Sequence, residues 1–329
     1  ERAMLDLAIV GGMVVDGTGG VPVRADVGIA DQRIAFIDPD GAEDLGARRT
    51  IDADGLTVAP GFVDVHTHYD AQLFWDPACT PSSLHGVTTI FGGNCGFSIA
   101  PLDDDPNYLM RLLSRVEGIP LEALEKGVPW NWRSFPEYLN AVESAGVGVN
   151  VGVLVGHSAL RRAVLGSRCH DAEVTAKDIA AMRELLVDGL EAGGMGFSSS
   201  WASTHLDGDG NPVPSRSANA DELVALSETL SDFPGTQLEF IPTNGQFEDI
   251  HLDVMTRMSL AARAELNWNV LIPRNFDWVE NRLNASNFAS ERGARVVGLS
   301  YQTRCASGSP SCRRHSIRSP AGPRSWRSR

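Results

Sequence analysis

The sequence predicts an α/β protein whose core is a barrel of parallel strands, and two observations lead to this fold class. Short apolar runs rich in valine, glycine and isoleucine recur along the chain, and helical patterns separate several of them. Apolar strands that alternate with helices are typical of a parallel sheet buried on both faces. The runs number seven, at 58–65, 87–91, 149–155, 195–199, 237–241, 268–272 and 295–299. Seven strands predict a (β/α)8 TIM-barrel-type fold that lacks its last strand.

The helices between these strands follow from apolar spacing. The segment 175–192 opens with a threonine suited to capping and then places apolar side chains one helical turn apart. The segments 221–230 and 250–264 have similar patterns. An open doubly wound sheet is the alternative to a barrel. No glycine-rich dinucleotide motif follows the first strand, which disfavours that alternative.

The barrel segment, 57–302, is expected to lie between two different regions. Residues 1–56 read as a small β module with a hairpin turn at Asp31 and Gln32. Within the barrel, 103–140 forms an insertion rich in aromatic residues. We expect it to be either a helical flap over the barrel mouth or a satellite core. The last segment, 303–329, crowds arginine, serine and proline without periodicity and predicts a disordered basic tail.

Charge and composition exclude several classes of protein. The 329 residues carry a formal net charge of −14, although 304–329 holds seven arginines and no acidic residue. The acidic body argues against a nucleic-acid partner. No apolar run approaches the roughly 18 residues of a membrane span, and no signal peptide is apparent, so we expect a cytoplasmic protein. The composition of the tail is typical of the translation of a GC-rich gene in the wrong reading frame. The alternative is that the tail is a genuine basic segment of a shortened enzyme.

The strongest chemical motif stands where the first barrel strand ends. His66 and His68 follow an apolar strand and a Pro-Gly pair. Because side chains alternate along a strand, both imidazoles face the same way, toward the mouth at which barrel enzymes carry their sites. Two imidazoles at this spacing are able to hold one divalent metal ion, with Asp64 or Asp70 orienting them.

A cysteine stands at the end of the next strand. Cys95 lies among glycines that permit tight turns, in a Gly-Gly-Asn-Cys-Gly sequence at 92–96. A buried structural cysteine is the ordinary interpretation of a single Cys. The position beside His66 and His68 favours a thiolate metal ligand instead. The remaining cysteines are few and scattered, so a disulfide framework is not expected.

Several segments together resemble one family. The Gly-Phe-Val-Asp-Val-His-Thr-His sequence at 61–68 resembles the metal motif of the amidohydrolase superfamily. The sequences at 86–89, 93–102, 155–161 and 194–199 are similar to those of the N-acyl-D-amino-acid deacylases, or D-aminoacylases. The resemblance covers roughly 5–302. It implies zinc-dependent hydrolysis of the linear amide of a small N-acyl-D-amino acid, with His66, His68 and Cys95 as metal ligands.

The sequence departs from the family pattern in two respects, and the first concerns the metal ligands. The family expects histidine ligands at the ends of strands five and six, where this chain has Glu239 and Asn269. Glu239 is therefore a candidate oxygen ligand, and His205, in a polar loop after strand four, is a candidate replacement. For His205 a solvated loop is the favoured interpretation. Hydantoinase-like enzymes carry a bridging lysine at the end of strand four, and this chain has none there. The resemblance to the D-aminoacylases therefore assigns the anionic ligand to Cys95.

The second departure is at the end of the chain and concerns the acid/base. The aspartate that the family carries on an eighth strand is absent, which leaves Asp70 as the candidate acid/base. His157, Arg161 and Ser199, at the third and fourth strand ends, are candidates for substrate contact. For His157 a hydrogen-bonded structural role is the alternative. Hydrolysis of another linear or cyclic amide, or a catalytically inactive fragment that only binds a ligand, are the alternative functions.

Overall fold

The small β module forms one sheet at the amino-terminal end of the chain. The computed structural model describes residues 4–41, 46–103, 105–272 and 275–300. The module contains β1 (Leu7–Val14), β2 (Val23–Ala30), β3 (Arg33–Asp38), β4 (Thr50–Asp52) and β5 (Thr57–Val58). The strand order is β3-β2-β1-β4, and β5 also pairs with β1. Asp31 and Gln32 both have positive φ, as the predicted hairpin turn between β2 and β3 requires. The sheet extends two residues beyond 56, and the division of the chain at that residue stays a prediction.

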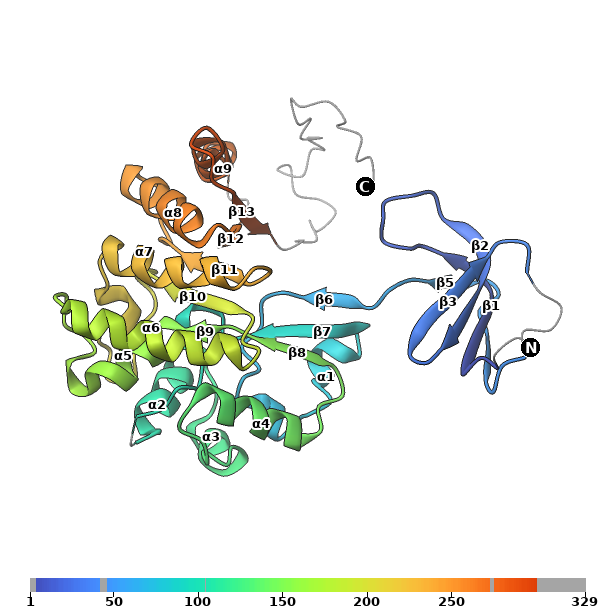
Figure 1. Cartoon of the computed structure of the whole chain (residues 1–329), viewed down its shortest axis with the longest axis horizontal. Coiled ribbons are helices and arrows are strands. Elements are labelled where there is room, and N and C mark those ends of the chain that lie inside the picture. Colours follow the sequence, from blue (N-terminus) through green and yellow to red (C-terminus); the bar gives the residue numbers. More distant parts are fainter. Residues whose placement is uncertain (1–3, 42–45, 104, 273–274, 301–329) are drawn as a thin grey trace.

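The seven strands predicted from the sequence are all present. They are β6 (Phe62–Asp64), β7 (Val87–Gly92), β8 (Asn150–Val153) continued by β9 (Val155–Gly156), β10 (Gly196–Ser200), β11 (Gln237–Ile241), β12 (Leu266–Leu271) and β13 (Val296–Ser300). All pair in parallel, in the orders β6-β7-β8 and β9-β10-β11-β12-β13. Neighbours in space follow the order of the sequence, as in a barrel wall. Figure 1 shows the strands between the helices, with the small β module to one side.

Nine α-helices are present among the described residues. They are α1 (Thr80–Ser83), α2 (Asn107–Val116), α3 (Leu121–Gly127), α4 (Phe135–Ala145), α5 (His157–Leu165), α6 (Ala176–Glu191), α7 (Ala220–Glu228), α8 (Asp249–Ala262) and α9 (Phe276–Ser290). From α5 to α9 each helix contacts the next, so a continuous layer of helices covers the strands. The predicted cap of α6 is a reciprocal capping box between Thr175 and Asp178. No described helix is long and apolar enough to cross a bilayer.

The insertion belongs to the main hydrophobic core rather than to a satellite core, and it also reaches the candidate site. Trp132, Phe135 and Tyr138 are buried in the main hydrophobic core, so α4 is part of that core. The other end of the insertion reaches the mouth, where Glu117, just after α2, lies 3.6 Å from the His68 ring. The insertion is therefore both a packed element and part of the wall around the candidate site. The predicted tail, 303–329, lies outside the described residues.

The series of parallel strands has two outer edges without a partner among the described residues. The pairing scheme gives β6 a partner only in β7, and β13 a partner only in β12. Phe62 on β6 is 66% exposed, and unpaired apolar edges promote association between chains. We expect concentration-dependent self-association in size-exclusion chromatography with light scattering, and a smaller association for Phe62→Lys. A wild-type protein that stays monomeric at every concentration would contradict this expectation.

Candidate metal centre

The structure brings three predicted ligands together at the strand ends. His66 and His68 follow β6, and Cys95 lies in the short 3-10 turn η2 (Asn94–Gly96) after β7. The Cys95 Sγ lies 3.3 Å from His66 Nε2 and 3.6 Å from His68 Nε2. One ligand atom from each residue falls within 4.8 Å of the others. This is a compact set of two imidazoles and one thiol, which is a donor set that zinc prefers.

The turn that carries Cys95 is fixed by backbone geometry and by hydrogen bonds. A β-carbon at Gly93 would collide with the backbone of Leu154, and Gly93 also has a positive φ, so glycine is required there. Cys95 itself adopts a positive φ of 58°. The hydroxyl of Ser198 on β10 accepts a hydrogen bond from Gly96 N at 3.0 Å and donates one to Gly93 O. The turn that carries the thiol is therefore held by β10.

Two buried carboxyl groups complete the support of this turn. Asp70 accepts a hydrogen bond from Gly93 N at 3.1 Å, and Glu239 accepts one from Cys95 N at 2.8 Å. Asn269 donates its side-chain amide to the second oxygen of Glu239. Glu239 thus lies directly behind the cysteine and orients its backbone, while it stands outside the compact ligand set. Ligation of a metal by Glu239 stays a prediction.

The protonation of the ligand set suits a bound cation. Burial lowers the pKa of His66, and burial with the neighbouring imidazoles lowers the pKa of His68 to about 3, so both rings are neutral at pH 7. Burial and the nearby Glu239 raise the pKa of the Cys95 thiol well above its ordinary value. A divalent metal ion stabilises the thiolate form of such a group.

The surrounding acids also lack a compensating charge. Burial raises the pKa of Asp70 to about 7 and that of Glu239 to about 8, and burial with Asp70 raises the pKa of Glu117 to about 7. The hydrogen bonds to Asp70 and Glu239 come from amide groups rather than from arginine or lysine. One oxygen of Asp70 is buried with no partner. These residues therefore fit a site whose charge a metal ion balances.

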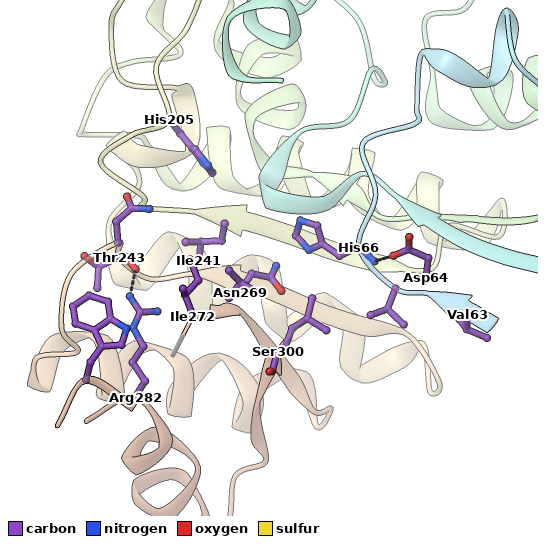
Figure 2. A pocket seen from close by; sticks show the side chains of 15 residues that line it. Val63, Asp64, His66, His205, Ile241, Thr243, Asn269, Ile272, Arg282 and Ser300 are labelled. Carbon is purple, nitrogen blue, oxygen red and sulfur yellow. Dashed lines mark hydrogen bonds between the residues drawn. The ribbon is translucent and has the colours of Figure 1, made fainter. Parts of the chain in front are cut away.

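Two cavities meet at the cluster. A cavity of about 590 Å³ is lined on one side by His66 and Asp64 and on the other by Asn269, Arg282 and Ser300. Figure 2 shows this cavity, with His66 between β6 and the β11–β12 side. A second cavity of about 470 Å³ is lined by a set that includes His68, Cys95 and Glu117. A small molecule in either cavity would lie against a ligand of the cluster.

The position of His205 differs from the favoured prediction. It was expected in a solvated loop, but it lines both cavities, and burial lowers its pKa to about 4. Its Nδ1 lies 2.8 Å from Ser200 Oγ at the end of β10. It is outside the compact ligand set. The signal that could have found it is its position just after the fourth strand end, where barrel sites gather their residues.

The candidates for substrate contact form a buried network. His157 Nδ1 lies 2.8 Å from Ser199 Oγ, and His157 Nε2 lies 2.8 Å from Glu222 Oε1. Arg161 Nη1 donates to both oxygens of Glu222 at 2.6 Å. The side chains of His157, Arg161 and Glu222 are all 0% exposed. The geometry supports the structural role considered for His157, and substrate contact at these residues stays a prediction.

This chain is similar in sequence and structure to known proteins. Residues 49–306 match the model of the amidohydrolase family. The chain is 34% identical to the D-aminoacylase of Alcaligenes xylosoxydans xylosoxydans over 73% of this chain and 45% of that protein. It is 40% identical to an uncharacterized protein of Mycobacterium tuberculosis (strain ATCC 25618 / H37Rv) over 64% of this chain and 35% of that protein.

A solved structure extends the comparison. The N-acyl-D-glutamate deacylase from Bordetella bronchiseptica, complexed with zinc and a phosphonate inhibitor, superposes with a TM-score of 0.70 at 29% identity. The match covers 90% of this chain and 58% of that chain. This chain therefore spans less than half the length of the two curated relatives described above, and about three fifths of this solved structure.

Proposed function

Since the chain belongs to the amidohydrolase family, we propose that it is a zinc-dependent hydrolase that cleaves N-acyl-D-amino acids to a D-amino acid and a carboxylate. The observation that carries the proposal is the compact His66, His68 and Cys95 set beside two cavities. The activities named for the relatives, D-aminoacylase and N-acyl-D-glutamate deacylase, support the choice of substrate class. A cytoplasmic location remains part of this proposal.

In this proposal, different residues of the site bind the metal and support the turn that carries Cys95. His66, His68 and Cys95 would hold the metal, and Glu239 and Asp70 would keep the cysteine turn in place through Cys95 N and Gly93 N. When bound, the metal supplies Lewis acidity that polarises the amide carbonyl and lowers the pKa of water toward neutrality. Asp70 lines neither of the two cavities described, so in this proposal it supports the turn. Acid/base action by Asp70 stays a prediction.

The test combines metal analysis with an enantiomer comparison. We expect purified protein to hold zinc and to hydrolyse N-acetyl-D-amino acids, with the L-enantiomers as matched controls. Removal of the metal with a chelator should abolish turnover, and added zinc should restore it, because the chain itself offers no other Lewis acid at the cluster. The readouts are bound zinc by mass spectrometry and released amine by a colorimetric assay.

Each result decides between functions. Zinc without turnover on any N-acyl-D-amino acid would contradict the deacylase and leave a metal-binding protein. Turnover of cyclic amides but not of N-acyl-D-amino acids would favour the alternative substrate class. Protein that binds no zinc would overturn the metal centre itself.

A further inference from the structure

His205 presents one ring nitrogen to the space around the cluster. Its Nδ1 is occupied by Ser200 Oγ at 2.8 Å, and the residue lines both cavities. Figure 2 shows the ring directed from its loop into the larger cavity, on the side of His66. The Phe97 ring supports it, with a centroid separation of 4.9 Å. With Nδ1 engaged, Nε2 is the atom left to meet a ligand.

The hydrogen bonds of the buried Ser200 favour the tautomer of His205 that carries its proton on Nε2. Ser200 Oγ accepts a hydrogen bond from Ala202 N at 3.0 Å, which leaves its hydroxyl hydrogen to donate. The partner in reach is His205 Nδ1. An imidazole that accepts at Nδ1 is neutral and carries its proton on Nε2. In this tautomer His205 offers an N–H donor to the cavities.

The loop that carries His205 is anchored by Asp207, two residues after it. Asp207, 1% exposed, accepts hydrogen bonds from Asp209 N and Asn211 N at 3.0 and 2.9 Å and closes the loop on itself. Its other oxygen accepts the Tyr108 hydroxyl at 3.2 Å and lies 3.4 Å from His170 Nε2. These contacts tie the loop to helix α2 of the insertion. Such anchoring keeps a donor in place before substrate arrives.

We propose that His205 is a catalytic residue whose Nε2–H donates a hydrogen bond to the carbonyl oxygen of the scissile amide. The proposal rests on the proposed function, because it assumes an amide substrate at the cluster. Water adds to the carbonyl carbon, and the electron pair of the C=O bond moves onto the oxygen. The C–N bond then breaks, the amine leaves with a proton derived from water, and the carbonyl re-forms. His205 keeps its proton throughout, and its hydrogen bond is strongest while the oxygen is charged.

The test measures binding as well as turnover. The probe is a phosphonate analogue of an N-acyl-D-amino acid, in which tetrahedral phosphorus replaces the carbonyl carbon. We expect zinc-loaded His205→Ala to bind this phosphonate on the order of 10²-fold more weakly than wild type, with a matching fall in kcat. The D-amino acid product lacks the carbonyl group of the scissile amide and should bind both proteins equally. His205→Gln, which retains an N–H donor, should recover part of the loss.

The controls separate this role from folding and from metal binding. Ser203→Ala changes an exposed side chain of the same loop that lines neither of the two cavities, and it should behave as wild type. Equal phosphonate affinity in wild type and His205→Ala would overturn the inference and leave the proposed function intact. Loss of zinc from His205→Ala would also overturn it, in favour of a ligand role. A wild-type protein that binds no zinc would contradict the proposed function, and the inference would fall with it.

Discussion

Replacement of Cys95 by alanine is expected to weaken zinc binding by more than about 100-fold and to abolish hydrolysis. Loss of a residue that only supports a ligand typically costs 10 to 100-fold in metal affinity, and Cys95 is a direct member of the set. It also supplies the anionic donor, since His66 and His68 are neutral at pH 7. Without it the cluster keeps two neutral imidazoles. The measurement is a competition titration against a chromophoric zinc chelator.

Cys79 provides the matched control for this experiment. It is also fully buried, but it lies outside the ligand set. Burial raises the pKa of its thiol to about 11, as expected for an inert structural cysteine. Cys79→Ala should therefore keep the zinc affinity of wild type. Similar zinc affinities for Cys95→Ala and wild type would show that Cys95 is not a ligand.

The sequence was sufficient for the parts of this site that depend on local pattern. His66 and His68 directly follow β6, two positions apart, and Cys95 follows the neighbouring parallel strand, β7. Parallel strands end at the same edge, so the meeting of these residues follows from topology. The positions of the strands could also be predicted, because strands of a buried parallel sheet appear in the sequence as continuous apolar runs such as 237–241.

The remainder depends on contacts that no local pattern specifies. His205 was expected in solvent because its loop is polar, yet the buried carboxylate of Asp207 folds that loop against Tyr108. Glu222 lies in a segment with an ordinary helical pattern, which does not predict a buried charge. In the structure it pairs with Arg161, 61 positions away in the chain. Both cases are polar groups buried by long-range partners. Apolar periodicity predicts where the core lies, but it does not predict which charges the core contains.

Glu222→Gln is expected to cost about 3–5 kcal/mol of unfolding free energy. The glutamate holds the guanidinium of Arg161 through two contacts of 2.6 Å and His157 through one of 2.8 Å, all fully buried. The substitution keeps the size of the side chain but leaves the charge of Arg161 without a counter-charge in a medium of low dielectric. The measurement is urea denaturation followed by circular dichroism.

Glu228 on the same helix α7 is the control for this change. Its pairing with Arg183 is on the surface, with side chains 58% and 37% exposed, so Glu228→Gln should cost less than about 1 kcal/mol. Replacing both Glu222 and Arg161 with leucine should recover much of the loss, because no unpaired charge then remains. Equal unfolding free energies for wild type and Glu222→Gln would show that the network adds nothing to stability.

The stability difference between wild type and Glu222→Gln should also depend on pH. Burial acts to raise the pKa of Glu222, but the hydrogen bonds and charges of His157 and Arg161 outweigh it and hold the pKa below the ordinary 4.5. The unfolded chain therefore takes up a proton at Glu222 before the folded protein does. The stabilisation is fully present above about pH 4.5 and is lost as the pH falls through the lowered pKa. A difference that instead grew on acidification would mean that Glu222 is protonated in the folded protein, and the charge-paired network would then be the wrong description of this core.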